Sequence, residues 1–217
     1  MRVIIVGSIF IIGIIISYFM LTPSDEKPLP VINPADVNSE MVDEDLVRQG
    51  HGHKIGAFSF TDQTGKTFGL DDVKGKVFVA EYFFSTCGTI CPRMTEQMER
   101  VHYKFKSNKD VAILSFTVDP ETDTVARLAE YAKQHNANAK QWHFLTGKKE
   151  DLYQVARRSF FVLKPAAVRN QGDVGSDFIH TNNFVLVDRE LHIRGYYDGT
   201  DPKDVDRLMR DMERLLD

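Results

Sequence analysis

Two strongly apolar runs limit what this chain can fold into. They are VFVAEYFF, residues 77–84, and VAILSFTV, residues 111–118. Each run is too apolar to face water on either side, which is typical of central strands in a sheet that helices cover on both faces. Apolar residues at helical spacing follow the first run, after Pro92. The pattern predicts a domain of alternating strands and helices.

Weaker signals complete this arrangement. Residues 57–70 alternate apolar and polar on either side of the turn Asp62-Gln63-Thr64-Gly65, which predicts a β-hairpin. The further predicted elements are a helix over 122–135, a strand over 142–145, a helix over 149–159, two adjacent strands within 183–199 and a helix over 201–216. Strands that alternate with helices and close on an antiparallel pair predict a three-layer α/β domain with a mixed sheet.

Length, charge and cysteine content exclude several classes of protein. The chain has 217 residues, enough for one domain and an appendage, and a formal net charge of -4. No basic run interleaved with aromatics is present, so nucleic acid is not an expected partner. Two cysteines in so long a chain cannot form a disulfide scaffold, which indicates a reactive or metal-binding pair.

The N-terminus predicts a membrane anchor. Residues 3–21 are free of charge, and 19 helical residues nearly match a hydrocarbon core of about 30 Å. No small-residue cleavage site follows, and the charges flanking the span favour a cytoplasmic N-terminus. We expect an anchor over 1–22, a proline-rich linker over 23–50 and a domain over 51–217. Without an Arg-rich, Ser-rich presequence, the expected location is the bacterial cytoplasmic membrane, with the domain on the periplasmic side.

The only cysteines, Cys87 and Cys91, lie where a central strand ends and a helix begins. Open α/β sheets place their binding sites at this edge. Backbone N–H groups and the helix dipole favour thiolates there, so we expect both thiols to be ionised. A helical turn between the two residues would point both sulfurs the same way, close enough to bridge or to share one ion.

Three segments together resemble the Sco/SenC family of membrane-anchored copper proteins with a thioredoxin-like fold. They are C-x-x-x-C-P after VAEYFF, then FTVDPETDT, then IHTNNFVLVD. The likeness runs from about His51 to the C-terminus and includes the anchor, although Gly56 stands where the family often has proline and residues 161–179 follow no pattern. It implies that Cys87, Cys91 and His180 bind copper and serve assembly of the dinuclear copper centre of cytochrome c oxidase.

The chemistry of these ligands agrees with the resemblance. Soft thiolates suit Cu(I), and an added imidazole gives a site that also accepts Cu(II). Three ligands leave a position open, through which a receiving protein can begin to bind. The predicted function is therefore that of a copper metallochaperone. Its expected partners are a copper-receiving subunit of cytochrome c oxidase and a thioredoxin-like reductant, because an oxidised pair cannot bind copper as two thiolates.

A membrane-anchored thiol–disulfide oxidoreductase is the alternative. It would use Cys87 and Cys91 as a redox-active pair and would make the protein an enzyme, which the copper carrier is not. Its usual motif has two residues between the cysteines and a cis-proline facing them, whereas His180-Thr181 stands in that region here. A thiol peroxidase is less compatible, because it needs a lone attacking cysteine with Thr or Ser three residues before it, and Phe84 and Gly88 stand at that place for the two cysteines.

Two acidic residues near the pair have open roles. Glu81 lies inside an apolar strand, where it either relays protons or pairs with a Lys or Arg. Asp119 follows the second apolar run and either orients a ligand or starts the next helix. The remaining candidates are interpreted as solvated, structural or core residues: His51, His53, His102, His135, His143, His192, Met94 and Met98.

Overall fold

The computed structural model describes residues 11–14, 17, 27–38, 41–48, 50–162 and 182–217. Within them, one mixed sheet has the strand order β2-β1-β5-β4-β3-β6-β7. Its strands are β1 (Ser59–Asp62), β2 (Thr67–Gly69), β3 (Val77–Phe83), β4 (Val111–Thr117), β5 (Trp142–Thr146), β6 (Asn183–Val187) and β7 (Ile193–Asp198). Strands β3, β4 and β5 are parallel, and the other pairs are antiparallel. The predicted hairpin, central strands and closing antiparallel pair are confirmed.

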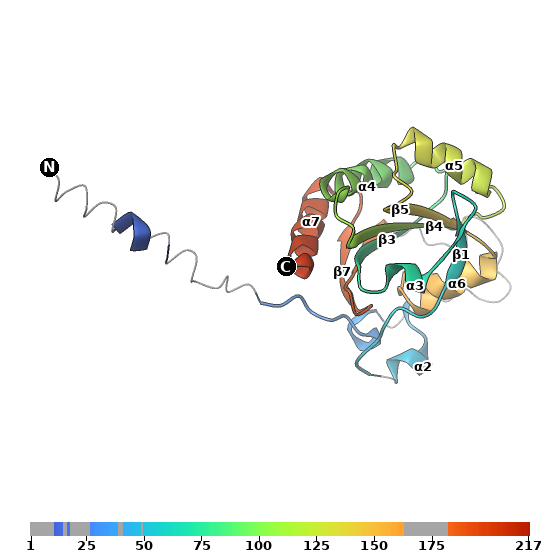
Figure 1. Ribbon diagram of the computed structural model, residues 1–217. Helices are drawn as coiled ribbons and strands as arrows, with labels where there is room; N and C mark the ends of the chain where they lie inside the picture. The colour runs from blue at the N-terminus through green and yellow to red at the C-terminus, as the bar shows by residue number, and fades with distance from the viewer. Residues whose placement is uncertain (1–10, 15–16, 18–26, 39–40, 49, 163–181) are drawn as a thin grey trace.

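Helices cover both faces of the sheet (Figure 1). The helical elements are η1 (Pro34–Asp36), α2 (Glu44–Val47), α3 (Leu70–Val73), α4 (Cys91–Phe105), α5 (Val125–Gln134), α6 (Lys149–Arg158) and α7 (Pro202–Leu216). Helices α4, α5 and α7 pack on one face, while α6 and α2 pack on the other. All seven residues of both β3 and β4 are buried, because each strand contributes alternate side chains to two separate cores.

Local sequence accounts for the helix starts around the site. Proline follows Cys91 in the first turn of α4, where its missing N–H costs nothing. Asp201 caps α7 by accepting a hydrogen bond from the Lys203 N–H at 3.0 Å. Helix α3 is an addition to the predicted elements; its four residues are too short to show a helical period.

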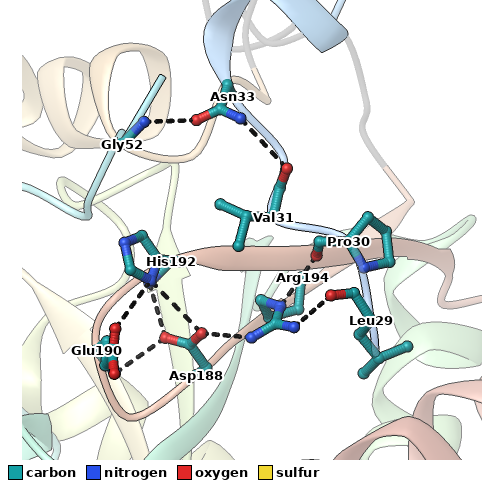
Figure 2. Close-up of polar contacts among 9 residues, drawn as sticks. All are labelled: Leu29, Pro30, Val31, Asn33, Gly52, Asp188, Glu190, His192 and Arg194. Carbon is teal, nitrogen blue, oxygen red and sulfur yellow. Dashed lines mark hydrogen bonds and ion pairs between the residues drawn. The ribbon is translucent and has the colours of Figure 1, made fainter. Parts of the chain in front are cut away.

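Residues 29–32 of the proline-rich segment are extended and lie along β7. The Ile32 N–H donates to the Ile193 carbonyl at 2.8 Å, a contact of the kind that neighbouring strands make. Figure 2 shows Arg194 reaching the carbonyls of Leu29 and Pro30 while it pairs with Asp188. These residues are therefore fixed to the sheet edge.

The expected anchor over 1–22 falls mostly outside the described residues. In the parts of the chain that are described, no helix has the length and apolar character needed to cross a bilayer.

Candidate metal centre

The cysteine pair lies at the carboxyl end of β3. Cys91 is the first residue of α4, and Cys87 precedes it in the loop that connects β3 to this helix. Both are free thiols, with exposed fractions of 9% for Cys87 and 3% for Cys91. The predicted position at a strand-to-helix junction is confirmed.

The Cys87 thiol has a lowered pKa, which favours its ionised form. Burial alone would raise its pKa, but hydrogen bonds from the backbone N–H groups of Thr89 and Cys91 outweigh burial and lower the pKa to about 7. The Cys91 N–H lies 3.5 Å from the Cys87 sulfur, and the Thr89 hydroxyl lies 3.6 Å from it. A large share of Cys87 is therefore thiolate at neutral pH.

The pKa of the Cys91 thiol is shifted in the opposite direction. Burial raises the pKa of its thiol to about 12; a hydrogen bond from the Phe84 N–H opposes this effect, and the Cys87 sulfur and the Glu81 carboxyl add to it. The prediction that both thiols are ionised is wrong for Cys91. The helix start favours a thiolate at both positions, but only the more exposed sulfur gains enough hydrogen bonds to overcome desolvation.

Glu81 lies on the same face of the sheet as the cysteines, fully enclosed in the core. Its Oε1 accepts a hydrogen bond from the Ser115 hydroxyl at 2.6 Å, and Ser115 in turn accepts from the Trp142 indole N–H at 2.8 Å. Its Oε2 has no hydrogen-bond partner. Burial raises the pKa of Glu81 to about 7, against the opposing Ser115 hydrogen bond.

The ion-pair interpretation of Glu81 is wrong within the described chain. No Lys, Arg or His side chain in that part of the protein forms an ion pair with it. A buried acid without a cation holds its proton more tightly than usual. Glu81 is thus a protonatable group inside the core whose charge affects Cys91.

Asp119 lies at the predicted sheet edge but does not cap α5. The cap is Thr124, whose hydroxyl accepts a hydrogen bond from the Arg127 N–H at 3.4 Å. The helix-starting role proposed for Asp119 is therefore wrong. A ligand-orienting role stays a prediction.

The third expected ligand, His180, lies outside the described residues. Among the residues that are described, no three His, Cys, Asp or Glu side chains are grouped closely enough to hold a metal. The two thiols therefore form a partial ligand set, to which one nitrogen would add a third donor. Two soft sulfurs side by side are a donor set that fits Cu(I).

His102, His135, His143 and His192 have structural partners, as interpreted from the sequence, whereas His53, expected in a solvated turn, is half-buried. Their nearest polar groups are Ser159 O for His53, Gln141 for His102, Glu99 for His135, Asp62 for His143, and Asp188 for His192. Met94 and Met98 are fully buried in the core, as expected. His51 is exposed.

Sequence reasoning missed one residue that touches the cysteine loop. Asp123 belongs to the segment FTVDPETDT, and its fully buried carboxylate accepts hydrogen bonds from the Ser85 N–H. In the sequence, Asp123 is an aspartate in a loop after a buried strand, and this pattern is too common to indicate a functional role.

Comparison with known families gives a match over most of the chain. The family model described as SCO1/SenC matches residues 47–217. The chain is 32% identical over 163 residues to "SCO1 protein homolog" of Bacillus subtilis, covering 74% of this chain and 82% of that protein. It is 26% identical to a protein of Stutzerimonas stutzeri whose name proposes copper binding, over 75% of this chain and 77% of that one.

Solved structures agree with the fold. A SCO1/SenC family lipoprotein from Bacillus anthracis matches with a TM-score of 0.67 and 32% identity, over 76% of this chain and 96% of that one. BsSco, described as a member of the Sco family of cytochrome c oxidase assembly proteins with a disulfide switch, matches with a TM-score of 0.63 and 33% identity. This match covers 75% of the present chain and 93% of BsSco.

Proposed function

The chain belongs to the SCO1/SenC family, and we propose that it is a copper metallochaperone that binds copper through Cys87, Cys91 and His180. It would pass the ion to the copper-receiving subunit of cytochrome c oxidase during assembly of the dinuclear copper centre. Both Cu(I) and Cu(II) would be carried, with His180 more important for Cu(II).

One observation carries this proposal: two free thiols lie at one helix start, and the N–H of one residue donates to the sulfur of the other. Cys87 needs little further deprotonation near neutral pH, because its pKa is about 7. The pKa of Cys91 is about 12, so its proton leaves only when the metal arrives. Copper binding would therefore release protons, and the affinity would rise with pH.

The proposal includes a place in the cell. Residues 3–21 would anchor the chain in the bacterial cytoplasmic membrane, with the domain on the periplasmic side. In that compartment the dithiol would oxidise unless a thioredoxin-like reductant restored it.

Copper titration of the full chain tests the proposal. We expect one tightly bound Cu(I) per reduced chain, and loss of that site in Cys87→Ser and Cys91→Ser. His180→Ala should weaken Cu(II) more than Cu(I), whereas the matched control His135→Ala should change neither, because His135 pairs with Glu99. An unchanged copper stoichiometry in both cysteine variants would refute the carrier. Equal losses of Cu(I) and Cu(II) affinity in His180→Ala would refute the ligand role of His180.

A thiol–disulfide oxidoreductase is the second candidate, favoured by the opposite ionisation of the two thiols. A largely ionised Cys87 beside a protonated Cys91 suits attack by the first sulfur and resolution by the second. Insulin reduction with a dithiol as electron source would favour this candidate if turnover persisted while copper failed to bind.

A further inference from the structure

A buried carboxylate links β4 to the cysteine loop. Asp123 is completely enclosed in the loop that follows β4. Its Oδ2 accepts a hydrogen bond from the Thr117 hydroxyl at 2.5 Å. The Ser85 backbone N–H donates to the same carboxylate, at 3.1 Å from Oδ2 and 3.3 Å from Oδ1. The hydrogen bonds therefore join residues that are 38 positions apart in the chain.

Ser85 directly follows Phe84, whose backbone N–H and carbonyl contact the two cysteines. The N–H of its neighbour Phe84 hydrogen-bonds the Cys91 sulfur. The carbonyl of Phe84 accepts the Cys87 N–H at 3.2 Å. Fixing Ser85 from outside the loop thus fixes the peptide units that set where both sulfurs lie.

A second contact reinforces the first. The Arg127 Nε–H donates to the Ser85 hydroxyl at 3.1 Å, from the first turn of α5. Thr117, Asp123 and Arg127 therefore hold one residue of the cysteine loop against the exit of β4.

Both Asp123 oxygens act as hydrogen-bond acceptors in these contacts. Within the described chain no basic side chain forms an ion pair with Asp123, so its partners are hydrogen-bond donors. A carboxylate accepts on both oxygens, whereas an asparagine would direct an NH₂ group at a donor. A buried donor left without an acceptor is unfavourable enough to displace a short loop.

We propose that Asp123 is a positioning residue that holds the 84–87 loop so that the Cys87 and Cys91 sulfurs stay within bonding reach of one another. This inference rests on the proposed function of the cysteine pair as the working site. Held sulfurs have a high effective concentration for each other, which favours both a shared ion and a disulfide. Loss of the carboxylate should therefore weaken both.

The test is the equilibrium of the full chain with glutathione, without copper. One protein dithiol and one oxidised glutathione give one protein disulfide and two reduced glutathiones, so two electrons and two protons move to glutathione. For Asp123→Asn we expect the equilibrium constant of this reaction to fall about tenfold, equivalent to about 30 mV. The Cu(I) affinity should fall by a similar factor in a separate competition titration.

A matched control separates positioning from general loss of stability. Asp62 is also a buried carboxylate: its Oδ1 accepts three hydrogen bonds, from the Thr64 N–H and hydroxyl and the Lys66 N–H in the β1–β2 turn, and its Oδ2 lies 3.4 Å from His143 Nδ1. Asp62→Asn should lower the melting temperature and leave the glutathione equilibrium unchanged within about twofold. An unchanged equilibrium in folded Asp123→Asn, or an equal shift in Asp62→Asn, would overturn the proposal.

A second variant covers the case in which Asp123→Asn does not fold. Arg127 is exposed, and Arg127→Ala removes the reinforcing contact to Ser85 together with an exposed ion pair to Glu130. For Arg127→Ala we expect the equilibrium constant for disulfide formation with glutathione to fall about threefold. An unchanged equilibrium constant would overturn the proposal. The glutathione equilibrium is measured without copper, so the two proposals can fail separately. If the unsubstituted chain did not bind copper but Asp123→Asn still shifted the equilibrium, the copper carrier would be refuted and the positioning role of Asp123 would be supported.

Discussion

The two ends of β3 carry polar groups of different kinds. At the carboxyl end lie Glu81 and the cysteine pair. Beyond the other end, where Phe78 faces Val187 of β6, lies a cluster that we call the Arg194 cluster: Asp188, Glu190, His192 and Arg194 with the carbonyls of Leu29 and Pro30 (Figure 2). The Arg194 cluster has more charged groups, yet the cysteine end has the reactive chemistry.

The two ends differ in how completely their buried polar groups are hydrogen-bonded or ion-paired. In the Arg194 cluster, Asp188 pairs with Arg194 at 2.7 Å and accepts the N–H groups of Glu190 and His192 at 2.9 Å. Burial would raise the pKa of Asp188, but these contacts lower it below its usual value. At the cysteine end, Glu81 has an oxygen without a partner and an elevated pKa. Dense, complete pairing stabilises a fold, whereas incomplete pairing leaves groups ready to exchange protons.

The largest expected effect is a loss of stability in Arg194→Ala, without a change in copper binding. Arg194→Ala leaves the Asp188 carboxylate buried without its cation and releases Leu29 and Pro30. Breaking a buried pair from one side costs about 3–5 kcal/mol. Urea denaturation should show a loss of this size, with copper stoichiometry unchanged. The exposed Arg48→Ala is the control, expected to cost less than about 1 kcal/mol. Loss of copper binding in folded Arg194→Ala would break the distinction between the two ends.

The next effect falls on the pH dependence of stability. The pKa of Glu81 is about 7 in the folded protein against 4.5 unfolded, so the folded state binds the proton more tightly. The contribution of Glu81 is therefore fully present below pH 4.5 and is lost as pH rises through 7, by roughly 3 kcal/mol. Glu81→Gln should remove this loss between pH 5 and pH 8 in urea denaturation.

The cysteines must be absent from that comparison. Cys87 has a lowered pKa of about 7, so its own contribution rises with pH and would mask part of the effect. Both proteins should therefore carry Cys87→Ser and Cys91→Ser. An unchanged pH slope after Glu81→Gln would mean that Glu81 does not titrate in this range.

The sequence predicted the parts of this protein that follow from continuous local patterns. Strands β3 and β4 were predictable because both of their faces are buried, so no polar residue interrupts the first except Glu81. The junction of β3 with α4 followed from a strand run and a proline in the next helix. These signals placed the cysteine pair correctly.

Contacts to backbone atoms could not be predicted in the same way. Arg194 binds carbonyls of residues 164 and 165 positions away, and Asp123 binds a peptide N–H 38 positions away. Every residue except proline carries both backbone groups, so such partners leave no mark in a sequence. The opposite ionisation of the cysteines was also hidden, because it depends on a small difference in burial and on which sulfur receives the N–H groups.

A smaller effect distinguishes the two thiols. Near pH 7 iodoacetamide should modify Cys87 about a hundredfold faster than Cys91, because the far smaller thiolate fraction of Cys91 is only partly offset by its greater nucleophilicity. The rate at Cys87 should be half-maximal near pH 7. Peptide mass spectrometry over time measures both rates. Cys87→Ser is the control, since Cys91 should stay slow when alone, and equal rates would refute the assigned ionisation.

The smallest effect tests whether burial, rather than the number of contacts, makes the Arg194 cluster stabilising. The Glu190 side chain is 76% exposed and lies 3.7 Å from His192. Exposed ion pairs contribute little, so Glu190→Gln should change the free energy of unfolding by less than about 0.5 kcal/mol. Its backbone N–H still donates to Asp188, so the buried half of the cluster stays intact. Urea denaturation beside Arg194→Ala makes the comparison within one cluster. If Glu190→Gln cost as much as Arg194→Ala, then charge alone would hold this end together, and the contrast between satisfied and unsatisfied groups would lose its physical basis.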